Sequence, residues 1–340
     1  MGKIVVAVGA VATVAGAVWL LAADSGRGTA STELLNVSYD PTRELWRELN
    51  EKFIPRYEKQ SGDALSIKQS HGGSTTQARA VIDGLDADVV TLALWSDTDA
   101  IRKAGLIADG WDRRLPHRSL PYFSTIVFVV RKGNPHHIRD WPDLLRPGVQ
   151  VLTPNPKTSG NGKLSFLAAW GSVIRGGGSE QEARDFVTRL YQRVPVLDTG
   201  ARGTTVTFAQ NGIGDVHLTW ENEAHLEVLE ARGELEVVHP PCSIRAEPYV
   251  AVVDANVERK GTRAAAEAYL KFLYTEEAQE VIARHHYRPI DPGVFQRHAR
   301  SFPELDLFPV TIAAKDWDDA QEKFFATGGV FDAIYKPKGH

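Results

Sequence analysis

The stretch TPNPKTSGNGKLSFLAAWGSVIRGGG, residues 153–178, passes from a polar, glycine-containing loop into an apolar segment with helical spacing. Leu164, Leu167, Ala168 and Gly171 fall on one face of the expected helix. The first turn of a helix leaves backbone N–H groups without partners, and the helix dipole adds partial positive charge there. The stretch therefore predicts either a plain helix cap or a binding site for an anion.

Two other loops have the same arrangement. Residues 70–76 (SHGGSTT) lead into a helical pattern over 78–85, and residues 199–205 (TGARGTT) lead into one over 206–213. Ser, Thr and Gly before a helix usually only cap it. Three such loops in one chain, each richer in glycine than a cap requires, favour anion binding, although the residues do not identify the anion.

Apolar segments alternate with the helical ones along the chain. LLNVSY at 34–39 predicts a buried strand, followed by a helix that Asp40 would cap and Pro41 would begin. Further strands are expected at 88–94, 126–130, 149–153, 215–220, 235–238 and 249–253. This alternation predicts an α/β fold with largely parallel sheets. The long segment between the strands at 126–130 and 249–253 suggests a second lobe inserted into the first.

The first residues have the pattern of an export signal. Lys3 precedes an uncharged stretch from residue 4 to residue 23 that ends in Leu-Ala-Ala. We expect residues 1–23 to be a signal peptide and residues 24–32 a polar linker. An uncleaved membrane anchor is the alternative, because about 20 apolar residues can just span a bilayer. The expected location is periplasmic or otherwise extracytoplasmic.

Composition excludes several classes of protein. The 340 residues carry a formal net charge of −4 and contain no basic run, which argues against a nucleic-acid partner. The single cysteine, Cys242, cannot form an internal disulfide, and no Cys/His cluster has the spacing of a metal site. We therefore expect no metal and no cofactor.

Catalytic motifs are weak. The chain has no G-x-S-x-G sequence. His71 lies three residues before Ser74, so a Ser–His pair is conceivable, but the sequence identifies no acid to orient it. A secreted enzyme acting on a sulfated or phosphorylated substrate, with Ser74 or Ser159 as nucleophile, stays open as the less favoured alternative.

Longer motifs carry a family resemblance over residues 33–335, in which the chain is similar to the periplasmic sulfate-binding proteins of ABC transporters. The related thiosulfate-binding proteins share much of the pattern. The motifs are LLNVSYDPTREL (34–45), SHGGS (70–74), ADVVTLAL (87–94), STIVFVVRKGNP (124–135), TPNPKTSGNGK (153–163), GARGTT (200–205), GIGDVHLTWENEA (212–224) and AEAYLKFLYTEEAQEVIARHHYRP (266–289).

The resemblance implies a two-lobed periplasmic binding protein of type II, each lobe a mainly parallel sheet flanked by helices. The expected first lobe is residues 33–127 plus 240–300, and the second is 128–239 plus 301–340. The lobes would close about the segments near 126–130 and 249–253. The implied function is to capture sulfate and deliver it to ABC permease subunits, as a monomer and without catalysis. Thiosulfate and molybdate are the alternative ligands.

The resemblance also implies the binding residues, all of them hydrogen-bond donors. In this sequence they are the amides of Asp40 and Ser74 in the first lobe, and in the second lobe Ser159 with its hydroxyl, the amides of Gly160, Asn161 and Ala201, and the indole of Trp220. Asn161 stands where the family commonly has glycine, and Arg202 is expected to brace its loop rather than touch the anion.

Donors alone suit sulfate, which carries no proton at neutral pH. Phosphate usually keeps a proton and needs an acceptor, yet the loops at 70–76, 158–163 and 199–205 contain no Asp or Glu. A mispaired buried group costs roughly 1–3 kcal/mol, so this donor set predicts discrimination against phosphate.

Overall fold

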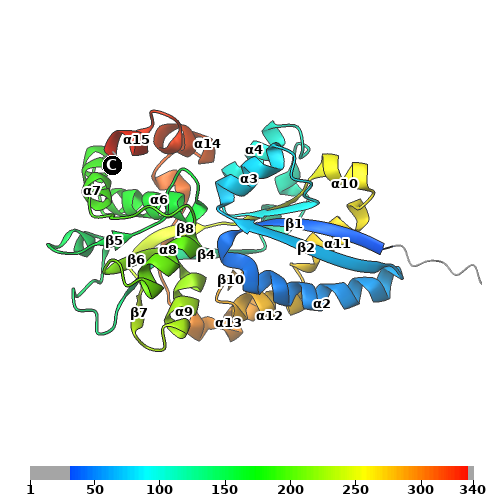
Figure 1. Ribbon diagram of the computed structural model, residues 1–340, viewed down its shortest axis with the longest axis horizontal. Coiled ribbons are helices and arrows are strands. Elements are labelled where there is room, and N and C mark those ends of the chain that lie inside the picture. The colour runs from blue at the N-terminus through cyan, green and yellow to red at the C-terminus, as the bar shows by residue number, and fades with distance from the viewer. Residues whose placement is uncertain (1–30, 336–340) are drawn as a thin grey trace, which may run out of the picture.

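The first lobe of the computed structural model, which describes residues 31–335, is built on the strand predicted at 34–39 (Figure 1). That strand, β1, runs parallel to β2 on one side and to β3 on the other, and β9 closes the sheet antiparallel to β3. The elements of this lobe are β1 (Ser31–Tyr39), η1 (Asp40–Thr42), α2 (Arg43–Ser61), β2 (Ala64–Gly72), α3 (Ser74–Ile82), β3 (Val89–Leu92), α4 (Trp95–Lys103), η2 (Trp111–Arg113), the short turn α5 (Pro116–Ser119), β9 (Tyr249–Val252), α10 (Asp254–Lys260), α11 (Arg263–Phe272) and α12 (Glu276–Arg284).

The predicted helix after β1 begins two residues later than expected, at Arg43 rather than at Pro41. Asp40 is not its cap: Thr42 holds the cap position of α2. Asp40 is the first residue of the 3₁₀ turn η1, which Tyr39 caps and which leads into α2. The Asp40 side chain instead accepts a hydrogen bond from Arg43 at 2.7 Å. Helix α2 then buries Trp46 and Leu49 and ends at Gly62, whose φ of +80° is readily adopted only by glycine.

The second lobe is a larger sheet with strand order β11-β8-β4-β6-β5, with β7 and β10 also paired to β4. Its elements are β4 (Tyr122–Arg131), η3 (Trp141–Leu145), β5 (Val151–Leu152), α6 (Gly160–Arg175), α7 (Glu180–Tyr191), α8 (Ala201–Thr205), η4 (Val206–Gln210), β6 (Val216–Trp220), α9 (Glu221–Glu230), β7 (Leu235–Val238), β8 (Cys242–Ala246), β10 (Arg288–Pro289), α13 (Pro292–Arg297), η5 (Ala299–Ser301), β11 (Asp306–Phe308), η6 (Val310–Ile312), α14 (Trp317–Ala320), η7 (Gln321–Phe325) and α15 (Val330–Ile334).

The predicted two-lobed α/β fold is confirmed, but the second sheet is mixed rather than mainly parallel. Its long central strand β4 runs antiparallel to β6, β7, β8 and β10, and only the pairs β5–β6 and β11–β8 are parallel. The alternation of strands and helices in a sequence does not set strand direction. Antiparallel neighbours need no helical crossover.

The chain passes between the two sheets at three places: between α5 and β4, between β8 and β9, and between α12 and β10. Residues 122–127 and 242–246 make their backbone hydrogen bonds in the second sheet. We therefore propose lobe boundaries at these crossings, which moves both segments, and also residues 288–300, from the expected first lobe to the second.

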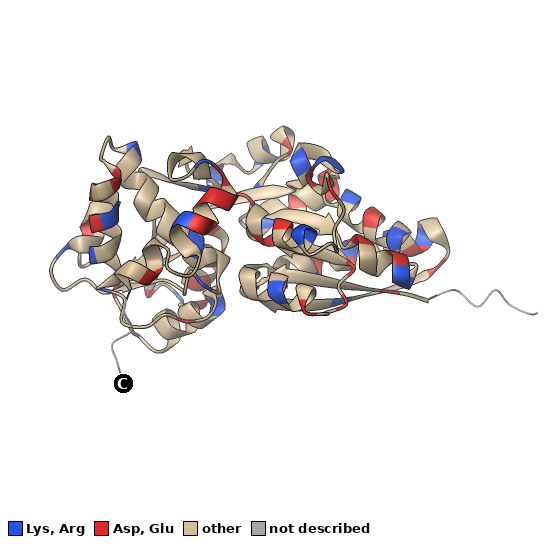
Figure 2. Cartoon of the chain, turned by 90° about the horizontal axis from the view of Figure 1, so that it is seen from above, with Lys and Arg blue, Asp and Glu red and all other residues tan. Residues whose placement is uncertain are grey.

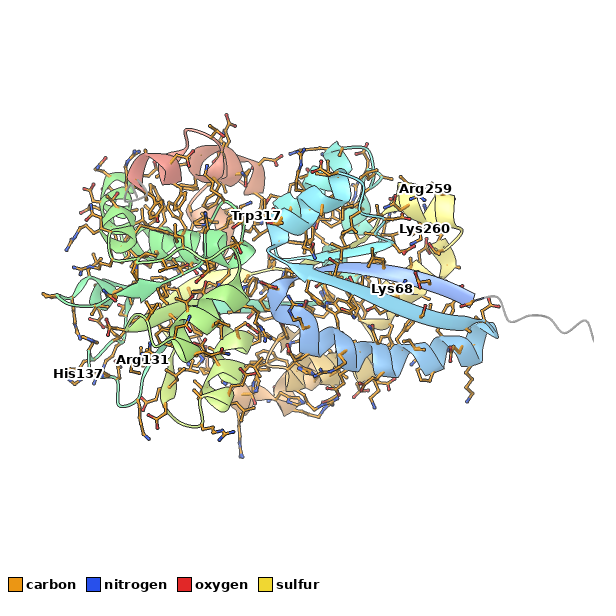
Figure 3. All side chains as sticks on the ribbon, in the orientation of Figure 1. Lys68, Arg131, His137, Arg259, Lys260 and Trp317 are labelled. Atoms are coloured by element: carbon orange, nitrogen blue, oxygen red, sulfur yellow. The ribbon has the colours of Figure 1, made fainter. Side chains whose placement is uncertain are left out.

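The two lobes stay distinct when the molecule is seen from above, with the positions of acidic and basic residues spread over both (Figure 2). Arg131 and His137 mark the end of the second lobe that is remote from the first, whereas Trp317 lies near the boundary (Figure 3). Beside Trp317, Asp318 pairs with Lys103 of α4 across the boundary at 2.7 Å.

Within residues 31–335, no helix combines the length and the apolar composition needed to cross a membrane. The expected signal peptide and residues 24–30 of the expected linker lie outside the described residues, and Ser31 and Thr32 already belong to β1.

Candidate functional site

The residues predicted to bind an anion all occupy helix starts that meet where the lobes touch. Asp40, Ser74 and Ala201 are the first residues of η1, α3 and α8. Ser159 is the cap of α6, and Gly160 and Asn161 are its first two residues. Trp220 ends β6 and holds the cap position of α9.

Close approaches of glycine backbone join the helix starts of the two lobes. A Cβ atom added to Gly160 would lie 2.5 Å from the Cβ of Ala93 and 3.2 Å from that of Ser74. One added to Gly73 would lie 2.4 Å from the carbonyl oxygen of Thr158. The sequence suggested that these glycines admit a ligand to the backbone; the structure shows that the opposite lobe requires them.

The loop at 199–205 meets the first lobe near Asp40. A Cβ on Gly200 would lie 2.5 Å from a carboxylate oxygen of Asp40, and α8 contacts η1. The Thr158 hydroxyl donates to the Thr199 carbonyl at 2.8 Å, so the two second-lobe loops also hold each other.

Burial of this region is nearly complete. Ser74, Ser159, Asn161 and Ala201 are each 1–2% exposed, and Trp220 is fully buried. The first turns of α3, α6 and α8 contain no acidic side chain. The dipoles of these turns therefore place partial positive charge in an enclosed region without a carboxylate in the same turns.

Trp220 presents a donor with no acceptor. Its ring packs on Tyr39 of the first lobe with centroids 5.2 Å apart, and within the described residues its indole N–H has no hydrogen-bond partner. A buried N–H without a partner is costly, and an indole can only donate. An anion at the lobe boundary would satisfy it.

The hydroxyl of Ser74 is already committed. It donates to Asp97 at 2.6 Å and accepts from the amide of Ala93 at 3.0 Å. The imidazole of His71 instead contacts Gln69 at 2.8 Å. The conceivable Ser–His pair between residues 71 and 74 therefore does not form.

The hydroxyl of Ser159 accepts from the amide of Gly162 at 3.4 Å, as an N-cap does. A hydroxyl that accepts in this way keeps its own proton for donation.

The substitution of asparagine for glycine at position 161 has a simple structural outcome. Asn161 lies in the first turn of α6 and is not among the residues with positive φ, so the position needs no glycine. Its side chain turns to the sheet, donating to the Leu218 carbonyl at 3.4 Å and accepting from Ser165 at 3.3 Å.

Arg202 bridges the lobes by way of carboxylates. It contacts Glu44 of α2 at 2.6 Å and Glu223 of α9 at 2.8 Å. Burial raises the pKa of Glu223 to about 8, against the influence of Arg202. Glu44 is the partner of Arg202 from the first lobe, and Glu223 is its partner from the second.

Two charged residues at this boundary were not indicated by the sequence. Lys163 of α6 and Asp97 of α4 form a buried ion pair across the lobes, with a distance of 3.4 Å. They are 66 residues apart, and neither lies in a charge pattern that would have suggested the contact.

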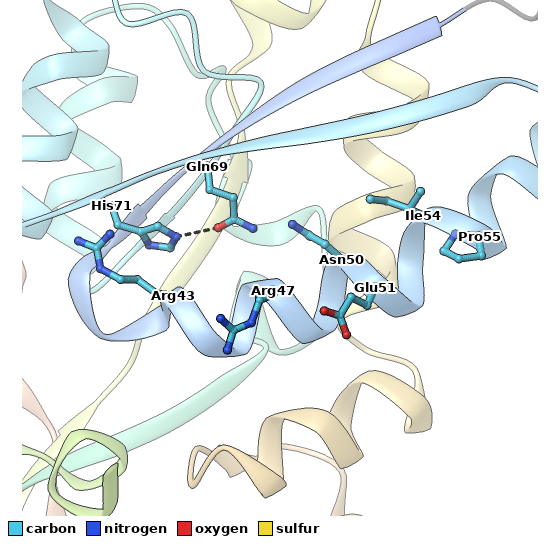
Figure 4. Close-up of a pocket in the computed structure, with 8 residues that line it drawn as sticks. All are labelled: Arg43, Arg47, Asn50, Glu51, Ile54, Pro55, Gln69 and His71. Carbon is cyan, nitrogen blue, oxygen red and sulfur yellow. Dashed lines mark hydrogen bonds between the residues drawn. The ribbon is translucent and has the colours of Figure 1, made fainter. Parts of the chain in front are cut away.

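A separate groove of about 540 Å³ lies on the first lobe between α2 and β2 (Figure 4). Arg43, Arg47 and His71 line it, and burial lowers the pKa of His71 to about 4. None of the predicted binding residues lines this groove.

Comparison with known proteins gives a consistent result. The family described as bacterial extracellular solute-binding protein matches residues 46–288. The sulfate-binding protein of Escherichia coli K12 is 52% identical over 323 residues, which is 94% of this chain and 98% of the relative. The thiosulfate-binding protein of Pseudomonas aeruginosa is 50% identical over 314 residues, 92% and 95% of the two chains. Among solved structures, the sulfate-binding protein SubI of Mycobacterium tuberculosis is similar with a TM-score of 0.78 at 34% identity, covering 86% of this chain and 99% of SubI.

Proposed function

The chain belongs to the family of bacterial extracellular solute-binding proteins, and from this premise we propose that it captures sulfate between its two lobes and delivers it to the permease of an ABC transporter. The names of its relatives, sulfate-binding and thiosulfate-binding proteins, support this assignment. Export by residues 1–23 and action as a monomer are parts of the same proposal.

The observation that carries the proposal is the donor set at the lobe boundary. The starts of η1, α3, α6 and α8 converge there, and the buried indole of Trp220 lacks an acceptor within the described residues. Backbone amides, the Ser159 hydroxyl and this indole would surround the anion. The dianion would be stabilised by oriented peptide dipoles, because the nearby cations Arg43, Lys163 and Arg202 already pair with carboxylates.

Binding would favour the closed arrangement of the lobes. Donors come from both lobes, so only a closed molecule offers the full set, and the anion stabilises that state by its differential affinity. The permease would then recognise the closed form. Motion about the three chain crossings would separate the lobes for release.

Thiosulfate is the second candidate ligand. The observation that favours it is the 50% identity to a thiosulfate-binding protein over nearly the whole chain. Both anions carry two negative charges and no proton at neutral pH, so the same donors serve either.

We propose binding without turnover. A serine nucleophile needs a base within hydrogen-bond reach. The carboxylate that accepts from Ser74 is Asp97, which already pairs with Lys163 and accepts from Thr75, and the imidazole of His71 is engaged by Gln69. No base contacts Ser159 among the hydrogen bonds of the described residues.

Titration calorimetry with sulfate, thiosulfate, molybdate and phosphate at equal ionic strength tests the proposal. We expect sulfate or thiosulfate to bind most tightly and phosphate to bind about 10- to 100-fold more weakly or worse, since the proposed amide, hydroxyl and indole donors offer its proton no acceptor. Incubation with an aryl sulfate and an aryl phosphate should release no phenol. Phosphate binding equal to that of sulfate, or steady hydrolysis, would contradict the assignment.

A further inference from the structure

The ion pair between Lys163 and Asp97 joins the two lobes and is almost completely buried. The ammonium of Lys163 lies 3.4 Å from the carboxylate of Asp97, and the two side chains are only 3% and 4% exposed. Phe325 covers the ammonium on one side, with its ring centroid 5.8 Å away. Removing one partner of such a pair leaves an uncompensated buried charge, which is strongly unfavourable.

Asp97 also fixes the start of helix α3. One carboxylate oxygen accepts from the Ser74 hydroxyl at 2.6 Å, and the other accepts from the Thr75 hydroxyl at 3.0 Å. These hydrogen bonds orient the first turn of α3, and that turn includes the Ser74 amide that we expect to face the anion. The Asp97 carboxylate thus holds the Ser74 amide in place without contacting the anion itself.

A carboxylate in this position creates an electrostatic problem. The Asp97 carboxylate is negatively charged and hydrogen-bonded to Ser74, the residue whose amide would bind the dianion. Burial leaves little water to screen the repulsion between the two negative charges. Lys163 supplies the compensating charge. It belongs to α6 of the opposite lobe, so it reaches Asp97 only when the lobes are together.

We propose that Lys163 and Asp97 are positioning residues for anion binding, in which Asp97 orients the α3 amide and Lys163 cancels the Asp97 charge on closure. The proposal rests on the proposed function. In this proposal, closure of the lobes completes the set of hydrogen-bond donors around the anion and also neutralises the Asp97 charge that would repel the anion.

The test is a double-mutant cycle read by sulfate titration. Lys163→Met should raise Kd about tenfold or more, because Asp97 then faces the dianion uncompensated. Asp97→Asn keeps an acceptor for Ser74 and should change Kd by less than Lys163→Met does. The double variant should regain most of the affinity lost in Lys163→Met, since the repelling charge is gone.

The exposed pair Lys103–Asp318 is the matched control, because it also joins the lobes but is about half exposed on both sides. Lys103→Met should leave Kd nearly unchanged. The thermal midpoint of each variant without sulfate shows whether it folds. If Lys163→Met does not fold, the comparison of Asp97→Asn with the double variant decides: a large loss of affinity in both contradicts the proposal.

Three results would overturn the inference: wild-type affinity in Lys163→Met, no recovery in the double variant, or a greater loss in Asp97→Asn than in Lys163→Met. Failure of the proposed function has a different signature, because the unmodified protein would then bind neither sulfate nor thiosulfate.

Discussion

At the scale of single residues, Trp220 brings to the lobe boundary a hydrogen-bond donor that is unpartnered within the described residues. Its ring is fixed between β6 and Tyr39, and its indole N–H is buried without an acceptor in the described part of the chain. Ser159 and Ser74 differ from it and from each other. Among the described residues, the Ser159 hydroxyl accepts a hydrogen bond from Gly162, and its own proton stays available for donation. The Ser74 hydroxyl already donates its hydrogen bond to Asp97.

We predict that Trp220→Phe and Ser159→Ala weaken sulfate binding by about 10- to 100-fold each, which is the loss of one hydrogen bond to a charged group. Phenylalanine keeps an aromatic contact with Tyr39. Ser74→Ala should cost less than either, because its main chain is the donor. Titration calorimetry ranks the three, and the assignment is wrong if Ser74→Ala proves the most damaging.

At the scale of elements, the sequence predicted the helices and strands that a short, contiguous pattern of residues indicates. The strand at 235–238 was predicted with its observed bounds, whereas Pro41 lies in the 3₁₀ turn that precedes the first long helix rather than at the start of that helix. Strand β2 was not predicted, because it lies at the sheet edge and its sequence ALSIKQSHG has too few apolar residues to show alternation. The direction of β4 depends on partners in β6, β7 and β8 that are 86 to 122 residues away, which no local pattern contains.

The candidate site divides in the same way. Its helix starts were recognisable because Ser, Thr and Gly before an apolar helix leave a pattern in the sequence. The interlobe role of Gly73 and Gly160 and the Lys163–Asp97 pair depend on contacts between segments far apart in the chain. Such contacts exist only after the lobes have formed and met.

The helix starts of α3 and α6 approach too closely to accept a side chain at either glycine. We predict that Gly73→Ala and Gly160→Ala raise the Kd for sulfate about tenfold or more, because a Cβ at either position collides with the opposite lobe and resists closure. Stability without sulfate should change little, since the clash arises only on closing.

Gly72→Ala is the matched control for this prediction. It is the residue immediately before Gly73, and its added Cβ would make an ordinary contact at 3.5 Å with Gln77. Equal losses in Gly72→Ala and Gly73→Ala, measured by calorimetry and by thermal unfolding of the ligand-free variants, would refute the steric explanation.

At the scale of the whole molecule, a stacked histidine pair joins the lobes on the side of α12. His225 of α9 and His286, which follows α12, have ring centroids 4.1 Å apart and planes 17° apart. Burial lowers the pKa of His225 from 6.5 to about 4, and it also lowers the pKa of His286. The charged and titratable groups that act on the pair are Glu221, His239, His285, Arg288 and His298.

This pair predicts lower stability in acid. The unfolded chain takes up the His225 proton below pH 6.5, while the folded chain resists it until about pH 4. The unfolding free energy should therefore fall as pH decreases through that interval, by about 1–2 kcal/mol from this site after allowing for solvent screening, and be unaffected above it. Urea titrations across the interval measure the slope.

His225→Gln should flatten the slope, and His137→Asn should not. His137 is exposed at the remote end of the second lobe (Figure 3). An unchanged slope in His225→Gln would mean that other groups govern the acid response.

The near-complete burial of the donor residues has a kinetic consequence. With the lobes together, the side chains of Ser74, Ser159 and Trp220 are 0–2% exposed, so we expect a bound anion to leave at the rate at which the lobes part. A high concentration of a competing anion then does not speed up dissociation of the bound anion. The residence time of the bound anion is set by the opening rate of the protein, not by the competing ion. Rapid release of the anion then requires a partner that binds both lobes and separates them.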